Sequence, residues 1–252
     1  MHINTFTAQG VITNNYRSRA VGDASVCEFE MELPVPGDKT QVVRFNAWND
    51  HAAIADKFKR GSRVRITGAV RESDWESSSE KKNRKVEVKI DAASHSIVQT
   101  NDEADVHEVI LAGVLNAVGA PRVFTWDNGA KEAVELWVAV GVEKEVKDGD
   151  GVRTIRPGVG VKVIGLGAAK FCKKDSDGKV IRNEAGEASL TDEAIASLAK
   201  DAPVRVTGTL FNDKFEDKAS SENRYDGYVS ADKLELGEAS GGESQSAEQD
   251  AA

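Results

Sequence analysis

Hydrophobic and polar residues alternate along much of the first hundred positions of the chain. Cys27, Phe29, Met31 and Leu33 share one parity, and glutamates occupy the positions between them. Successive side chains of a β-strand point to opposite faces, so this segment is predicted to form a half-buried strand. Residues 42–48 repeat the pattern and predict the next strand, after a Pro- and Gly-containing turn.

After residue 48 the spacing of the apolar residues changes from every second position to every fourth. Residues 52–60 place two large apolar side chains four positions apart, which predicts a short helix. Alternation returns around Val64 and Ile66, and again from Lys85 to Ile90. With one strand before them, these segments give five strands and a helix between the third and the fourth. That is the order of the OB fold, a small, partly open β-barrel.

Short sequence segments of the first half of the chain recur in the second half, in the same order. Residues 64–68, Val-Arg-Ile-Thr-Gly, return as Val-Arg-Val-Thr-Gly at residues 204–208. Two further matches follow in the same order: residues 10–12 with 113–115, and residues 75–76 with 215–216. Three ordered matches indicate an internal duplication. The second copy is longer, with extra sequence around 144–156 and 173–190.

The predicted class is therefore all-β with short helices, as tandem OB-fold barrels. We expect an OB-fold domain over residues 1–100, a polar, acidic linker over 101–105, and a second, divergent OB-fold domain over 106–236. Residues 237–252 contain no large apolar side chain and are expected to form a disordered acidic tail.

Composition narrows the class of protein. The net charge of −9 is uneven, at +2 over residues 1–100, −7 over 101–236 and −4 over 237–252. A phosphate-binding surface is therefore expected in the first domain. No apolar run approaches the roughly 20 residues that span a bilayer. The beginning of the chain lacks the features of a signal peptide, and Cys27 and Cys172 make no disulfide framework, so we expect a cytoplasmic protein without membrane contact.

Two tryptophans and a set of cations carry the candidate chemistry. Trp48 shares its parity with Arg44 and not with the core, so it either covers an interface or stacks on a ligand. Trp75 either stacks on a ligand or packs on its hairpin. Aromatic rings and cations together can hold unpaired nucleic acid, because bases stack on rings and phosphates need counter-charges. The remaining candidates are Arg63, Arg65, Arg71, Lys81, Lys82, Arg84 and Lys85, with Tyr16, Arg17 and Arg19 in the first inter-strand loop.

On these residues, the segment from Val42 to Trp75 resembles the central part of the bacterial single-stranded DNA-binding protein family. The resemblance implies base stacking at Trp48 and Trp75. It covers residues 1–100 well and 106–236 faintly. The chain departs from the family pattern in lacking an aromatic residue at Val42. It also has outward glutamates that would repel phosphate if DNA ran there: Glu28, Glu30 and Glu32. Either that face is solvent-exposed or a subunit contact, or the DNA path is narrower than in the family.

The second copy keeps less of this chemistry. Lys162 is matched to Arg44, whereas Leu166 takes the place of Trp48. Phe215 stands where the first copy has Trp75, and Trp137 lies off the core parity, so it is either exposed or part of an inter-domain contact. We expect a weaker DNA site or an assembly role for this domain.

No catalytic set, metal-ligand spacing or cofactor motif stands out. The glycines of residues 158–167 lack the spacing of a phosphate loop. The leading hypothesis is a non-enzymatic protein that coats single-stranded DNA in replication, recombination and repair. The family resemblance implies a homodimer with four OB folds, and replication or recombination proteins as partners. The alternative is a tandem-OB interaction module in such a complex, without strong DNA binding of its own.

Overall fold

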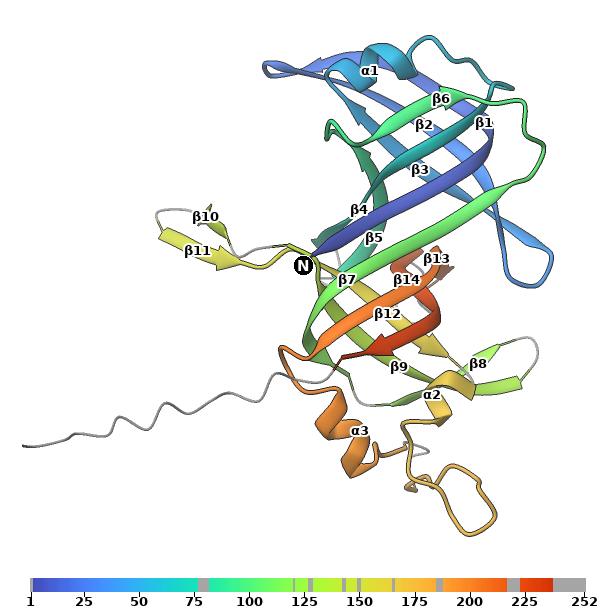
Figure 1. The fold of residues 1–252 in the computed structure, drawn as a ribbon, viewed down its shortest axis with the longest axis vertical. Helices are drawn as coiled ribbons and strands as arrows, with labels where there is room; N and C mark the ends of the chain where they lie inside the picture. Colours follow the sequence, from blue (N-terminus) through green and yellow to red (C-terminus); the bar gives the residue numbers. More distant parts are fainter. Residues whose placement is uncertain are drawn as a thin grey trace, which may run out of the picture.

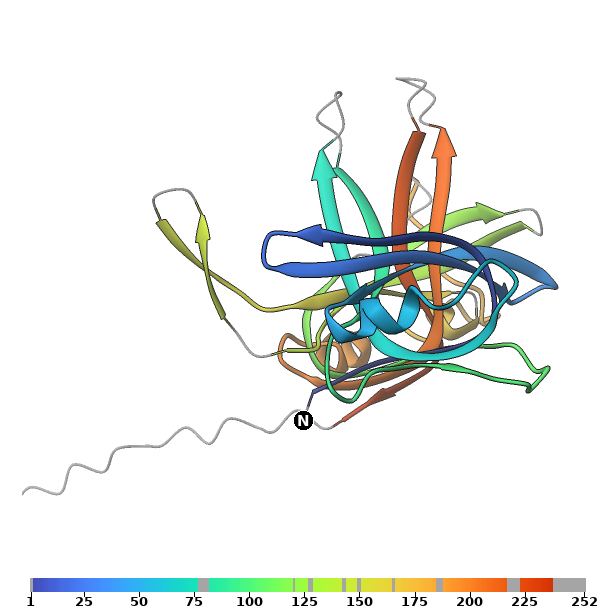
Figure 2. The same ribbon diagram turned by 90° about the horizontal axis from the view of Figure 1, so that it is seen from above.

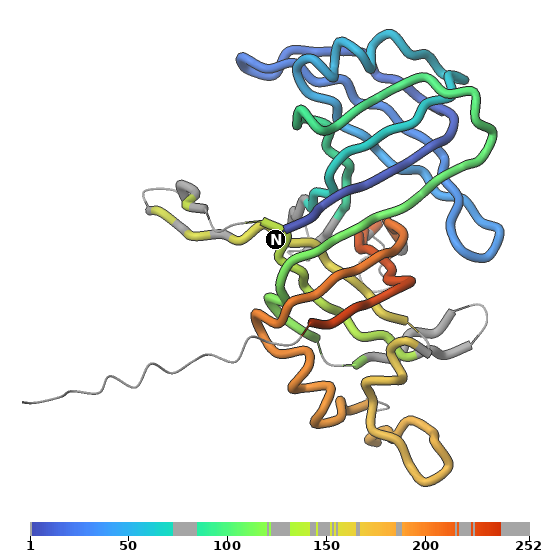
Figure 3. The backbone as a smooth tube through the Cα atoms, in the orientation of Figure 1, coloured from blue at the N-terminus to red at the C-terminus, as the bar shows by residue number. Residues whose placement is uncertain are grey.

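The computed structural model describes residues 2–76, 82–119, 121–126, 129–141, 144–148, 151–164, 166–184, 188–216 and 223–237. The chain forms two stacked β-barrels (Figure 1). Figure 3 follows it from the first barrel, blue to green, into the second, green to red. The tail predicted over residues 237–252 lies, apart from Gly237, outside the described residues.

The first barrel has the strand order that the sequence predicts. Each strand is joined to its neighbours in the order β1-β2-β3-β5-β4, and β4 pairs back with β1 to close the barrel. Its elements are β1 (Ile3–Val21), β2 (Ala24–Val35), β3 (Lys39–Trp48), α1 (Asp50–Ala55), β4 (Arg63–Glu76) and β5 (Lys82–Ile90), followed by β6 (Ser96–Gln99), which pairs with β4.

The inward residues of the alternating pattern fill this barrel. Phe29 and Phe45 face each other in the β2–β3 register and stack with ring centroids 5.0 Å apart. Phe6 meets Phe45 edge to face at 5.8 Å. Such aromatic pairs stabilise a core beyond the area that they bury. The alternation therefore encodes which face of each strand is buried.

The helix differs from its prediction. It covers Asp50–Ala55, whereas residues 52–60 were expected. The backbone N–H groups of Lys57 and Phe58 donate to carbonyls three residues back, so the chain tightens into turns. Phe58 still packs against the core, which explains why the apolar spacing resembled a longer helix.

The second barrel repeats this frame in its pairing. Gly10 lies opposite Val64 in the first barrel, and Gly113 lies opposite Val204 in the second, as the duplication predicts. Its elements are β7 (Val106–Val118), β8 (Arg122–Trp126), β9 (Gly129–Ala139), β12 (Gly158–Ile164), α2 (Leu166–Ala169), α3 (Asp192–Ser197), β13 (Pro203–Glu216) and β14 (Asn223–Leu236). The extra sequence around 144–156 forms a separate hairpin that projects from the barrels (Figures 1 and 2), β10 (Lys144–Asp148) with β11 (Gly151–Ile155).

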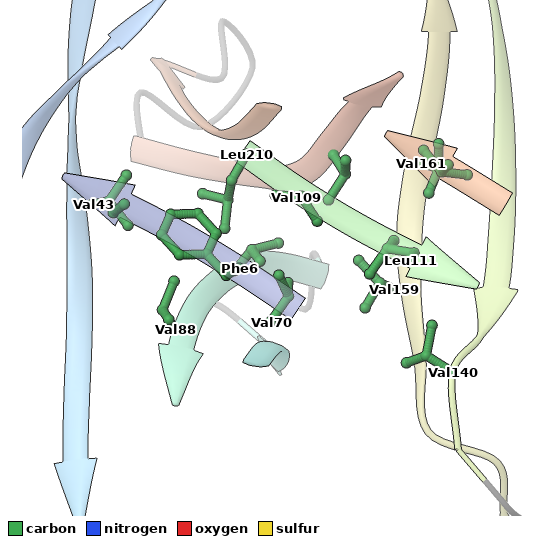
Figure 4. Close-up of a cluster of buried hydrophobic side chains, with 14 of the residues drawn as sticks. Phe6, Val43, Val70, Val88, Val109, Leu111, Val140, Val159, Val161 and Leu210 are labelled. Atoms are coloured by element: carbon green, nitrogen blue, oxygen red, sulfur yellow. The ribbon is translucent and has the colours of Figure 1, made fainter. Parts of the chain in front are cut away.

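A continuous sheet joins the two barrels. β1 pairs antiparallel with β7 over seven registered positions, from Ile3 opposite Ala112 to Gln9 opposite Val106. The buried side chains of both barrels form one hydrophobic cluster, in which Phe6 of β1 lies near Val109 of β7 (Figure 4). The barrels are therefore packed on one another as a unit.

The connector between the barrels is bound along its length. Buried Gln9 donates its side-chain amide to the carbonyls of Asp102 and Ala104, at 3.4 and 2.6 Å. Arg63 donates to the carbonyls of Asp102 and Glu103 and pairs with Asp105, each at 2.6 Å. The polar residues expected to form a linker thus follow the first barrel, because their backbone carbonyls accept hydrogen bonds from the buried side-chain nitrogen of Gln9 and from Arg63.

A second contact locks the hairpin β13–β14 onto the first barrel. The side-chain amide of Asn212 accepts from the N–H of Val86 and donates to its carbonyl, both at 2.8 Å. The side chain of Gln41 donates to the carbonyl of Leu210 and accepts from the N–H of Asn212. At Gly227, a Cβ atom would lie 2.5 Å from the backbone nitrogen of Val86, so only glycine allows this approach. We call these contacts the inter-barrel clasp.

His107 lies at the β1–β7 junction and should make stability depend on pH. Its Nδ1 is 2.8 Å from the carbonyl oxygen of Pro34, and its Nε2 is buried without a partner. Burial lowers its pKa from 6.5 to about 4. As the pH falls below 6.5, the unfolded chain gains a proton there before the folded chain does.

We therefore expect His107 to cost about 3 kcal/mol of stability between pH 6.5 and pH 4. Urea unfolding of the wild type and of His107→Leu across this range measures the difference. The loss should be smaller in the variant, and His2→Gln, at an exposed histidine, should match the wild type. Parallel pH profiles for wild type and His107→Leu would contradict the expectation.

Candidate nucleic-acid interface

Three of the predicted candidates, Tyr16, Arg44 and Trp48, lie on one outer surface of the first barrel, formed by parts of β1, β2, β3 and β5. Glu28 and Glu30 lie in register opposite Asn46 and Arg44. Asn46 donates to Glu87 of β5 at 2.7 Å, which connects the third strand of this surface. We call this surface the β3 face, formed by Tyr16, Glu28, Glu30, Arg44, Asn46, Trp48, Glu87 and Lys89.

Trp48 is the last residue of β3 and faces outward, as its parity predicts. It lies opposite Val26 and is partly exposed. The ammonium of Lys89 lies 5.2 Å from the centroid of its ring, a distance at which a cation is attracted to the ring face. Lys89 also pairs with Asp91 at 2.9 Å. Sequence reasoning did not single out Lys89, although its position between the inward Val88 and Ile90 identifies it as outward.

Tyr16 and Arg44 are brought together from distant parts of the sequence. The guanidinium of Arg44 lies 5.9 Å from the centroid of the Tyr16 ring, and Tyr16 is 48% exposed. Arg44 also pairs with Glu30 at 3.3 Å. Burial lowers the pKa of Arg44, but the hydrogen bond to Glu30 and the charges of Glu30 and Glu87 outweigh it and raise that pKa. Arg44 thus stays charged beside an exposed ring.

Tyr16, Arg17 and Arg19 lie within β1 and not in an inter-strand loop as expected, because β1 runs on to Val21. Carboxylates hold both arginines. Arg19 pairs with Glu28 at 2.9 Å, and Arg17 lies 3.9 Å from the carboxylate of Asp56. Arg17 also donates to the carbonyl of Asp56 at 3.2 Å. Two of the outward glutamates that were expected to repel phosphate, Glu28 and Glu30, therefore neutralise Arg19 and Arg44.

β4 divides the remaining arginines between two sides of the barrel. Its first half pairs with β1 and β6, so exposed Arg65 lies away from the β3 face. Arg63, on the same side, binds the connector. The second half pairs with β5 and places exposed Arg71 opposite Glu87, next to the β3 face.

The candidates of the β4–β5 hairpin can be placed by backbone register. Trp75 lies opposite Asn83, Lys82 opposite Glu76, and Arg84 opposite Asp74. The side chains of Trp75, Lys82 and Arg84, and the whole of Lys81, lie outside the described residues. Figure 2 shows this hairpin and β13–β14 rising from the same side of the molecule.

The register corrects the match between Lys162 and Arg44. In the first barrel, Phe45 of β3 lies opposite Val88 of β5. In the second, Val161 of β12 lies opposite Val229 of β14, so Val161 corresponds to Phe45. Lys162 therefore occupies the position of Asn46, and Gly160 that of Arg44. The residue of the second barrel that corresponds to Trp48 is Ile164. Leu166 is the first residue of α2, as Asp50 is the first residue of α1. The sequence match failed by two residues because the second barrel has no aromatic residue there to fix the alignment.

Lys162 is also buried, at 4% exposure. Its ammonium pairs with Asp226, lies 3.8 Å from Glu135, and sits 3.9 Å from the centroid of the Tyr228 ring. A cation enclosed by two carboxylates and a ring is not placed to meet phosphate. Lys162 therefore stabilises the second barrel.

The other candidates of the second barrel are positioned as follows. Trp137 is partly exposed and lies against Gly158, where a Cβ atom would be 2.2 Å from its Nε1. The indole thus covers β12 and explains one glycine of the glycine-rich stretch. Phe215 lies opposite Arg224 in β13, and its side chain is outside the described residues.

Within the described residues, no group of three or more His, Cys, Asp and Glu side chains could hold a metal ion. Cys27 and Cys172 are free and buried, and burial raises the pKa of both thiols. No described helix is long and apolar enough to cross a membrane.

The chain matches no protein-family model, and no curated protein is similar to it in sequence. Among solved structures, it is similar to the wild-type single-stranded DNA binding protein from Thermus aquaticus, with a TM-score of 0.56 and 18% identity, over 94% of this chain and 93% of that one. A deletion mutant of that protein with one further substitution gives a TM-score of 0.55 and 18% identity, over 94% and 95%. The chain therefore shares the fold of these structures over nearly its whole length, as two OB-type barrels in tandem.

Proposed function

We propose that this protein binds single-stranded DNA without catalysing a reaction. The observation that carries the proposal is the β3 face, where two outward rings each lie beside a cation: Trp48 with Lys89 and Tyr16 with Arg44. Unpaired bases stack on such rings whatever their sequence, and cations track the phosphates. The shared fold with a single-stranded DNA binding protein supports the proposal.

In this proposal, residues 1–100 are the main DNA-binding unit and residues 106–236 a second, weaker or assembling unit. Bases stack on Trp48 and Trp75, while Arg44, Arg71 and the cations of the β4–β5 hairpin meet phosphates. The protein would act in the cytoplasm in replication, recombination and repair, as a homodimer with four barrels, together with proteins of those processes. These finer roles extend the DNA-binding proposal by analogy.

The experiment is a titration of the full chain with oligo-dT, followed by tryptophan fluorescence at several salt concentrations. Stacking should quench the fluorescence. The logarithm of affinity should fall linearly with the logarithm of salt, by about 0.7 for each phosphate contact. Absence of quenching, or an affinity that does not depend on salt, would reject the proposal.

The rival function is a tandem-OB interaction module that binds proteins only. The ion pairs of Arg17, Arg19 and Arg44 favour it, because they neutralise part of the cationic surface. The same titration separates the two functions, since an interaction module would leave oligo-dT unbound at low salt.

If phosphate must displace Glu30 from Arg44, Glu30→Gln should strengthen DNA binding. The variant removes one carboxylate from the β3 face and leaves Arg44 charged. We expect affinity for oligo-dT to rise about two- to fivefold, since a partly exposed ion pair at the protein surface is worth up to about 1 kcal/mol. Glu193→Gln, on exposed α3, serves as the matched control and should not change affinity. Unchanged or weaker binding by Glu30→Gln would show that phosphate does not reach Arg44.

A further inference from the structure

A groove runs between the β3 face and the hairpin β13–β14 of the second barrel. Both barrels contribute to its lining, which includes Glu30, Val42, Arg44, Lys85, Asn212 and Tyr225. Arg44 belongs both to this groove and to the β3 face, so the two surfaces are continuous. A strand bound along the β3 face would therefore meet the groove as it approached the second barrel. We call it the junction groove.

The junction groove contains a third pair of ring and cation. The ammonium of Lys85 lies 4.2 Å from the centroid of the Tyr225 ring. Val42, at 54% exposure, adds apolar surface. The same combination occurs twice on the β3 face, at Tyr16 with Arg44 and at Trp48 with Lys89. Unlike those pairs, this one joins the two barrels.

The plainer interpretation is that Lys85 and Tyr225 only help to hold the barrels together. A cation–ring contact between two partly exposed side chains stabilises such a junction only weakly. The inter-barrel clasp already fixes the two elements, however, through both hydrogen bonds of Asn212 to Val86 and the close approach at Gly227. Tyr225 lies two residues from Gly227 on the same strand. The clasp thus holds the ring at a set position beside a groove that remains open.

We propose that the junction groove binds one unpaired nucleotide of a DNA strand that crosses from the first barrel to the second. The base stacks on Tyr225, and the phosphates on either side meet Arg44 and Lys85. This inference rests on the proposed function and extends it to a residue of the second barrel that sequence reasoning did not select. A groove fixed by the clasp loses little freedom when the strand enters, which favours binding.

The test compares short and long oligo-dT on the full chain. A strand of about 6 nucleotides fits one barrel, and one of about 30 nucleotides spans both. Tyr225→Leu should weaken binding of the long strand about five- to tenfold and leave the short strand unchanged, whereas Tyr225→Phe should bind both as the wild type does. Lys85→Gln should lower the salt dependence for the long strand by about one phosphate contact, and Lys179→Gln, in an exposed turn, should not.

Photo-crosslinking of the wild-type chain to a bromodeoxyuridine strand of about 30 nucleotides tests the site directly. A crosslink to the peptide that contains Tyr225 supports the proposal, and its absence overturns it. Wild-type affinity of Tyr225→Leu for the long strand, or equal losses in the leucine and phenylalanine variants, would also overturn it. If the wild type binds no oligo-dT at all, the proposed function itself fails, which is a different result.

Discussion

Replacing Trp48 and Trp75 together by alanine should weaken oligo-dT binding by roughly 2–6 kcal/mol, at about 1–3 kcal/mol for each lost base stack. Trp48 faces outward beside Lys89, and Trp75 lies at the far end of β4, near the tip of its hairpin. Because the variant lacks two of the four tryptophans, affinity should be measured by anisotropy of a labelled oligonucleotide.

The matched control keeps an aromatic ring at each position. Trp48→Phe combined with Trp75→Phe should retain most of the affinity, because stacking needs a ring face and not an indole. The single variants assign the loss to each tryptophan. Wild-type affinity in the double alanine variant, with an unchanged melting temperature, would show that DNA binds another surface.

Lys162→Met should lower the free energy of unfolding by about 3 kcal/mol and leave oligo-dT affinity unchanged below the melting transition. The methionine removes the cation that pairs with Asp226 and lies near Glu135. It also leaves more negative charge near Asp213, whose pKa burial already raises. An uncompensated carboxylate in such surroundings is costly.

Urea unfolding measures this loss. Lys233→Met is the control, since Lys233 is 69% exposed in its ion pair with Glu235, and it should change stability by less than about 1 kcal/mol. A second barrel that uses Lys162 for DNA would give the opposite result, with wild-type stability and weaker binding.

The fold was predictable from the sequence because its strands bury one face and expose the other. Alternation identified the inward residues of β2 and β3, and the repeat at residues 204–208 revealed the second barrel. The β1–β7 pairing and the inter-barrel clasp were not predictable, since they join residues far apart in sequence through backbone groups and side-chain amides. The clasp depends on Asn212 and Gly227, whose types alone predict only a turn or a bulge.

For the candidate site, the alternating pattern predicted which side of a strand each side chain faces, and no more. Trp48 and Arg44 face outward as expected, whereas Arg63 shares that parity and binds the connector instead. A strand pattern shows which side of the sheet a residue takes, but not which part of a closed barrel that side faces. Lys89 and Tyr225 were missed because a cation and a ring become a candidate site only when folding places them together.

The joining of β1 to β7 also limits how this chain can associate with other molecules. A strand edge with unpaired backbone groups readily recruits another strand, including one from a second copy. Here each of these two strands covers the edge of the other. In the twelve-stranded sheet of the described residues, only β6 and β8 end the strand order. A dimer of this chain would therefore have to meet through side chains on the barrel faces, through those short end strands, or through the projecting hairpin β10–β11, which forms a two-stranded sheet of its own.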